Sequence, residues 1–96
     1  MDDGMLTRRA GESQLDCVRR LLVERGSLGG FEVIFRLRYP DGSPTSITRL
    51  GARVMDLRAE GFVLENRAPA GHLADYHVVR SPYRVDETGR LRRVAA

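Results

Sequence analysis

The segment that most constrains the fold runs from Thr45 to Phe62, because its apolar residues recur at the spacing of an amphipathic helix. The residues of this apolar stripe are Ile47, Leu50, Val54 and Leu57. The helix start is indicated by Pro44, Thr45 and Ser46, because a proline cannot continue a preceding helix and a hydroxyl can cap the first free amides. Gly61 follows where a left-handed residue would end the helix. We therefore predict one core-packing helix from Thr45 to Glu60, about four turns long.

The opposite face of this predicted helix carries residues suited to a groove of DNA. It is formed by Thr45, Thr48, Arg49, Ala52, Arg53 and Asp56. The small Ala52 lies between two arginines one turn apart, and their guanidinium groups can reach base edges or phosphates. A solvated helix face carries the same residue types, so both interpretations stay open.

The composition is that of one ordinary globular domain. The chain has 96 residues, 42% hydrophobic and 30% charged, which argues against wholesale disorder. All 16 basic residues are arginine; we favour a GC-rich coding sequence over selection for bidentate contacts as the explanation. The net charge of +3 lies in residues 80–96, which hold five arginines and two acids, so residues 1–79 are neutral. Any DNA-binding surface must therefore depend on where the charges lie.

The remaining composition favours a cytoplasmic protein. Cys17 is the only cysteine, which excludes an internal disulfide and fits a reducing compartment. No apolar run approaches the roughly 18 residues that span a bilayer, and residues 1–12 lack the apolar core of a signal peptide. We expect no membrane partner.

The amino-terminal part predicts a leader and a first helix. Residues 1–12 show no periodicity and are expected to be a flexible, frayed leader. Ser13 then caps a helix that ends at Gly26. Its buried stripe is formed by Leu15, Val18, Leu21 and Leu22. Cys17 lies at the flank of this stripe, where we expect a semi-buried structural thiol.

A short connector over residues 27–30 leads to the segment FEVIFRLR. Phe31, Ile34 and Phe35 have helical spacing, which favours a second helix of about two turns. Val33, Phe35 and Leu37 also alternate, so a strand stays open as the alternative. The sequence YPDGSP that follows combines proline, aspartate and glycine in the strongest turn signal of the chain.

After Gly61 the period changes from helical to alternating. FVLEN places Phe62 and Leu64 on one face, and DYHVV does the same for Tyr76 and Val78. The loop between them is exposed and carries Arg67 and His72, so the two strands form a β-ribbon. Residues 80–96 are either a second hairpin, in which YRVD and LRRV flank a turn at residues 87–89, or a basic disordered extension.

This order of elements resembles a winged helix-turn-helix domain. The specific match is ITRLGARVMDLRAEGF followed by VLEN, a loop and DYHVV. It is similar to small winged-helix proteins of bacteriophages and actinobacteria, in which a segment like RLxARIxxLRxxGxxI precedes a β-wing. The resemblance covers residues 13–79 and implies an α+β fold of three helices followed by a two-stranded wing. Residues 1–12 and 80–96 lie outside it, and the connection RYPDGSPTS is longer than the turn of the compact motif.

The resemblance implies a regulator of transcription that binds double-stranded DNA with the Thr45–Glu60 helix in the major groove. The implied DNA-binding residues are Thr45, Ser46, Thr48, Arg49 and Arg53 on that helix, Arg67 and His72 on the wing, and Arg36 and Arg38 on the second helix. Arg49 is the candidate for a base contact and Arg53 for a phosphate. Asp56 and Glu60 repel phosphate, so only the amino-terminal half of the helix is expected to enter the groove.

Winged helices also serve as protein-binding modules, so a factor that binds a host or phage protein is the alternative. The neutral body favours a protein partner, whereas the arginine pair favours DNA. A homodimer is a further expectation, because one small module buries limited DNA surface.

We expect no enzyme, no cofactor and no metal site. His72 and His77 are the only histidines, and no second cysteine or acidic cluster has metal-ligand spacing. Asp75 and His77 can share a strand face, but the sequence places no nucleophile beside them. Gly29 and Gly30 are a pair in a connector and not a phosphate-binding loop.

Overall fold

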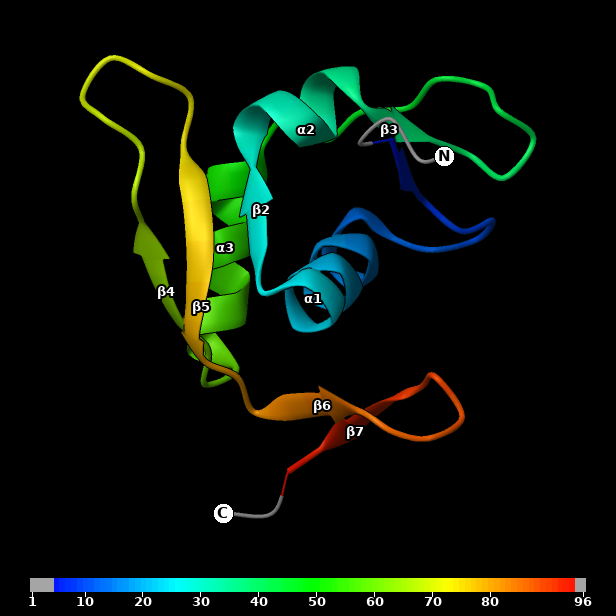
Figure 1. The fold of residues 1–96 in the computed structure, drawn as a ribbon, viewed down its shortest axis with the longest axis vertical. Helices are drawn as coiled ribbons and strands as arrows, with labels where there is room; N and C mark the ends of the chain where they lie inside the picture. The colour runs from blue at the N-terminus through cyan, green and yellow to red at the C-terminus, as the bar shows by residue number, and fades with distance from the viewer. Residues whose placement is uncertain (1–4, 95–96) are drawn as a thin grey trace.

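The computed structural model describes residues 5–94, which form an α+β fold of three helices and several short strands (Figure 1). The α+β class expected from the sequence is confirmed. In chain order the elements are β1 (Leu6–Thr7), α1 (Gln14–Arg25), β2 (Ser27–Gly29), α2 (Gly30–Phe35), β3 (Leu37–Arg38), α3 (Leu50–Ala59), β4 (Val63–Asn66), β5 (Asp75–Arg80), β6 (Tyr83–Val85) and β7 (Leu91–Arg93).

The central sheet has three antiparallel strands in the order β2-β5-β4. β4 and β5 are the two strands predicted by the alternating pattern. The prediction of a plain connector over residues 27–30, and with it of a sheet of only two strands, is wrong. Gly26 adopts φ +82° and reverses the chain after α1. This places Leu28, which is fully buried, opposite Tyr76 on the edge of β5.

The signals at both ends of α1 act as predicted. The Ser13 hydroxyl accepts a hydrogen bond from the Asp16 amide at 3.0 Å, and the Gly26 amide donates to the Leu22 carbonyl at 2.8 Å. Cys17 is fully buried, not semi-buried. Burial, reinforced by the nearby Glu12 carboxylate, raises the pKa of the Cys17 thiol to about 11, so the thiol is protonated at neutral pH.

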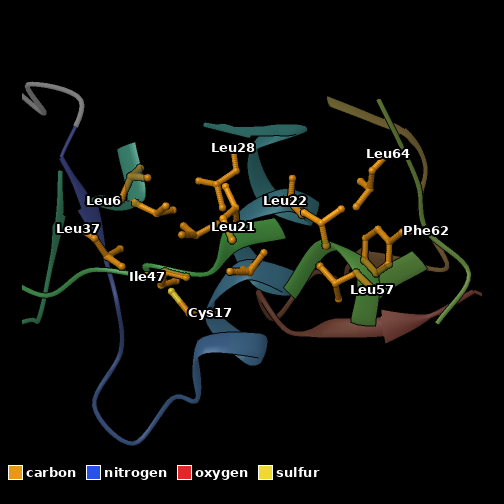
Figure 2. Packing of buried hydrophobic residues seen from close by; sticks show 14 residues of the cluster. Leu6, Cys17, Leu21, Leu22, Leu28, Leu37, Ile47, Leu57, Phe62 and Leu64 are labelled. Atoms are coloured by element: carbon orange, nitrogen blue, oxygen red, sulfur yellow. The ribbon is translucent and has the colours of Figure 1, made fainter. Parts of the chain in front are cut away.

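The core lies between the helices and the inner face of the central sheet (Figure 2). The predicted stripes are buried in it: Val18, Leu21 and Leu22 from α1, Ile47, Leu50, Val54 and Leu57 from the second stripe, and Phe62 and Leu64 from β4. Each fully buried aliphatic side chain contributes about 1.5–3 kcal/mol relative to its exposed state. Leu15, Tyr76 and Val78 pack on the edge of this core as partly buried residues.

The segment FEVIFRLR, for which the sequence left a helix and a strand open, contains both. It begins as the short helix α2 and becomes extended in β3 after Phe35. The predicted helix is therefore shorter than two turns. Val33 and Leu37 are fully buried, whereas Phe31 and Phe35 are 50% and 58% exposed. Within α2 the buried residues are Gly30 and Val33, and the aromatic face of the helix points to solvent.

Residues 5–12 of the predicted leader lie against the body, and residues 1–4 are outside the described chain. β1 pairs in parallel with β3, with Leu6 opposite Leu37. Arg20, only 8% exposed, binds Glu12 at 2.8 and 3.0 Å and the Thr7 carbonyl at 2.6 Å. Burial alone would raise the pKa of Glu12, but the hydrogen bonds from Arg20 and the Arg9 amide hold it below its ordinary value.

Residues 83–93 form the hairpin that the sequence left as one of two alternatives. β6 and β7 are antiparallel, and the Val94 amide donates to the Pro82 carbonyl at 2.8 Å. The Tyr83 ring packs on Phe62, with 5.9 Å between ring centroids. Tyr83 therefore joins the hairpin to the core, and Arg93 Nη2 of β7 also donates to the Glu60 carbonyl at 3.2 Å. Residues 95–96 are outside the described chain.

Candidate nucleic-acid interface

The chain approaches α3 as an extended segment, so the prediction that this helix begins at Thr45 is wrong. The Thr45 amide donates to the Leu37 carbonyl at 3.1 Å, and the Ile47 amide donates to the Val33 carbonyl at 2.9 Å. These bonds hold the segment against α2 and β3. Its amides already have partners outside a helix, and α3 starts only after this contact ends.

The predicted turn at YPDGSP is present and belongs to a small hairpin. The Gly42 amide donates to the Tyr39 carbonyl at 2.9 Å, and Asp41 Oδ1 accepts from the Ser43 amide at 2.8 Å. Arg38 and Pro44 form an isolated antiparallel bridge at its base. The connection between α2 and α3 is therefore a projecting hairpin and not the tight turn of a compact helix-turn-helix (Figure 1).

Four predicted site residues consequently precede α3 instead of lying on it. Thr45 is half-buried, and its Oγ1 accepts a long hydrogen bond from Arg8 Nη1 at 3.4 Å. Ser46 is also half-buried, whereas Thr48 and Arg49 are exposed. Only Thr48 and Arg49 of these four present an accessible side chain at the amino end of the helix.

Arg49 is the N-cap residue of α3. Its carbonyl accepts hydrogen bonds from the Ala52 and Arg53 amides at 3.1 and 3.2 Å, which fixes its backbone at the first turn. Its side chain makes no capping bond and forms no ion pair with any acid within residues 5–94. An exposed guanidinium at this end adds to the positive end of the helix dipole, and together they favour an anion.

The outer face of α3 differs from the doubly basic face that the sequence predicts. Arg53 Nε lies 3.2 Å from Asp56 Oδ2, and among the described residues this buried nitrogen has no well-aligned hydrogen-bond partner. Arg53 is thus turned along the helix toward an acid. Met55, between the small Ala52 and Ala59, is an apolar residue of this face and is 64% exposed. The small alanines allow another molecule to approach the α3 backbone closely, but of the two predicted arginines only Arg49 has no ion pair within residues 5–94.

The wing loop between β4 and β5 carries Arg67 and His72, as predicted. Asn66 Oδ1 accepts hydrogen bonds from the Ala68 and Asp75 amides, both at 3.1 Å, which ties the two ends of the loop together. Arg67 is exposed and its Nε lies 3.1 Å from Glu65 Oε1. His72 is exposed near the tip. The loop therefore exposes the Arg67 and His72 side chains on a backbone whose two ends Asn66 ties together.

The amino end of α3 and the wing loop lie at the same end of the molecule (Figure 1). A Cβ placed on Gly51, the second residue of α3, would lie 4.0 Å from Tyr76 Oη, where β5 begins. Arg58, farther along α3, also contacts β5, with its guanidinium 6.0 Å from the Tyr76 ring centroid. These contacts fix α3 against the strand that leaves the wing.

Arg36 and Arg38 lie away from the wing. The Gly30 amide, at the amino end of α2, donates to the Ala74 carbonyl of the wing loop at 2.7 Å, so the carboxyl end of α2 points the other way. Arg36 is the C-cap residue at that far end. Its guanidinium lies 5.7 Å from the Phe31 ring centroid. Arg38 Nη1 donates to the Leu37 carbonyl at 3.0 Å. Both arginines are half-buried.

An exposed apolar cluster on α2 was not recognised from the sequence. The Phe31 and Phe35 rings contact each other, with 5.0 Å between centroids, and Ile34 is 37% exposed beside them. Leu73 of the wing loop, 52% exposed, approaches the start of α2, since a Cβ on Gly30 would lie 3.4 Å from its Cβ. The helical spacing of these residues was visible, but spacing alone does not tell which face is buried.

Asp75 and His77 share the outer face of the sheet, as the sequence suggested. Asp75 Oδ2 lies 2.9 Å from His77 Nε2. Ser27 is the cross-strand neighbour of His77, yet no hydrogen bond joins these two side chains in the part of the chain that the structure describes. Among residues 5–94 there is also no group of three metal-ligating side chains.

Comparison of the chain with protein-family models, with curated proteins and with solved structures found no match. Among residues 5–94, no helix has both the length and the apolarity needed to cross a bilayer.

Proposed function

We propose that this protein binds double-stranded DNA as a small transcriptional regulator of the winged helix-turn-helix type. The order of three helices, α1 to α3, followed by the β4–β5 ribbon supports this proposal, and β2 adds a third strand to that ribbon. The observation that carries the proposal is the exposed Arg49 at the amino end of α3, at the same end of the molecule as the wing loop.

In this proposal the first turn of α3 enters the major groove. Arg49 contacts a base edge or a phosphate, and Thr48 beside it contacts the backbone. Arg67 and His72 reach the adjacent minor groove or its phosphates. Asp56 lies in the carboxyl-terminal half of α3, away from Arg49, and repels phosphate. The helix therefore approaches the duplex by its amino end and not along its whole length.

The proposal is tested by fluorescence anisotropy of a labelled mixed-sequence duplex over a salt series. The intact chain is compared with Arg49→Gln and with Arg25→Gln, a control that removes the same charge from an arginine bound to Glu32 at 2.6 Å. We expect Arg49→Gln to weaken binding and to lower the salt slope by about one. Equal effects of the two substitutions, or no binding by the intact chain at low salt, would reject the proposal.

The second candidate function is that of a protein-binding winged helix, and the exposed cluster of Phe31, Ile34, Phe35 and Leu73 favours it. A second copy of the chain is the partner that can be tested directly. Sedimentation equilibrium of the wild type and of Phe31→Ser with Phe35→Ser decides this case. A dimer that the double substitution dissociates supports the candidate, whereas a monomer at all concentrations rejects self-association through α2.

A further inference from the structure

The β6–β7 hairpin carries arginines on the face that points away from the body. Tyr83 of β6 packs on the core, so Arg84, the next residue of the strand, points to the opposite face. Arg84 lies directly opposite Arg92 in the strand register, and both side chains are exposed. Two positive charges thus share one face of a two-stranded ribbon.

This arrangement is not explained by the stability of the hairpin. Like charges directly opposite each other destabilise a strand pair, and cross-strand pairs of this kind change stability by about 0.2–1 kcal/mol. Arg92 is offset by Asp86, whose Oδ2 lies 2.6 Å from its Nε. Arg84 and Arg90 form no ion pair with an acid within residues 5–94. An anionic ligand outside the chain would remove the repulsion.

The positive charge continues from the ribbon to its base. Arg80 and Arg93 line an open groove of about 730 Å³ between the end of α3 and the hairpin. Glu60 also lines this groove, but its carboxylate is bound by Arg19 at 2.6 and 2.9 Å. Residues 80–96, which include Arg80 at the end of β5 and the hairpin, hold the net charge of +3, whereas residues 1–79 are neutral.

We propose that the hairpin is a second nucleic-acid contact, which binds the phosphate backbone without selecting a sequence. Arginine suits this ligand because its planar guanidinium binds phosphate oxygens in pairs. The hairpin lies at the opposite end of the molecule from the wing loop (Figure 1), so its contact is separate from that of Arg49. The inference deepens the proposed function and rests on it for the nature of the ligand.

The test combines Arg84→Gln and Arg90→Gln in one hairpin variant, since neither arginine is paired with an acid within residues 5–94, and compares it with a matched double variant, Arg9→Gln with Arg25→Gln. The control removes the same charge from two arginines that are paired with Glu24 and Glu32. Binding of a labelled mixed-sequence duplex is followed by anisotropy over a salt series, and circular dichroism melting of each free variant is the folding control. The hairpin variant should lower the salt slope by about two, while the control keeps the wild-type slope.

Each outcome decides between the two proposals. A reduced slope for the hairpin variant with an unchanged slope for Arg49→Gln supports the hairpin contact and rejects the role of α3. The reverse result overturns the hairpin contact and leaves the proposed function intact. Equal losses in the hairpin variant and its control also overturn it, because net charge would then explain both. Unchanged DNA binding together with weakened binding of poly-glutamate would assign the hairpin to an acidic protein.

Discussion

Arg19 and Glu60 form a two-pronged ion pair that joins α1 to the carboxyl end of α3. Arg19 Nε lies 2.9 Å from Glu60 Oε1, and Arg19 Nη2 lies 2.6 Å from Oε2. The Tyr83 hydroxyl donates to the same Oε1 at 3.2 Å, so the tail hairpin meets the pair as well. Because Arg49 begins the same helix, this ion pair helps to set the direction in which the amino end of α3 points.

We predict that this pair makes stability depend on pH. The hydrogen bond from Arg19 holds the pKa of Glu60 below its ordinary value of 4.5. The stabilisation is therefore complete above that value and is lost as the pH falls toward the lower pKa of the folded state. Glu60→Gln should lower the free energy of unfolding by about 1–2 kcal/mol at neutral pH. The difference from wild type should shrink as the pH falls below the ordinary value of 4.5.

Urea denaturation at several pH values measures both effects. The pKa of Glu12 is also lowered, but its contribution is the same in the two proteins and cancels in the difference. Glu65→Gln is the control, since Glu65 and Arg67 are 60% and 53% exposed and their pair should contribute about 0–1 kcal/mol. A Glu60→Gln protein as stable as wild type at neutral pH would show that the ion pair does not hold α3.

Two glycines should respond oppositely to alanine. Gly26 has φ +82° with open space around it, so Gly26→Ala should destabilise the protein by about 1–2 kcal/mol through backbone strain alone. Gly51 has an ordinary helical backbone, and a Cβ there meets only Tyr76 Oη at 4.0 Å. Gly51→Ala should leave stability unchanged or raise it by up to about 1 kcal/mol. Thermal melting measures both; a tolerated alanine at Gly26 would contradict the turn into β2.

The orientation of α2 predicts a contrast between neighbouring apolar residues. Val33 is fully buried and Phe35 is 58% exposed. Val33→Ala should lower the free energy of unfolding by about 1–3 kcal/mol, whereas Phe35→Ser should change it by about 0.5 kcal/mol or less. Chemical denaturation of the two variants decides the matter. A larger loss at Phe35 would mean that the aromatic face of α2 is buried, in the monomer or in an oligomer.

The parts of the fold that local chemistry determines could be predicted from the sequence. The start and end of α1 are set by Ser13 and Gly26, because a hydroxyl cap and a left-handed glycine act within a few residues. The alternation of Phe62 and Leu64 likewise identifies β4, since it records burial on one face. Gly61, with φ +111°, follows α3 as expected.

The errors arose where partners are distant in the sequence. Thr45 and Ile47 are not helical because their amides bind carbonyls of β3 and α2, which no local pattern reveals. β2 is too short to show alternation, and Leu28 becomes a strand residue only through its pairing with Tyr76. In the candidate site, Arg49 was identified correctly as exposed. Arg53 and Asp56 are three residues apart in the sequence, a spacing that favours an ion pair on a helix. This local signal argues against a phosphate contact by Arg53.

The central claim is that the amino end of α3 and the wing loop contact DNA together. The most direct measurement is a ¹H–¹⁵N correlation titration of the labelled intact chain with a mixed-sequence duplex at low salt. We predict that the largest amide shifts fall in residues 46–51 and 67–74, with a smaller set in the hairpin. Shifts confined to the hairpin or to α2, or no shifts at a saturating concentration of duplex, would contradict the claim.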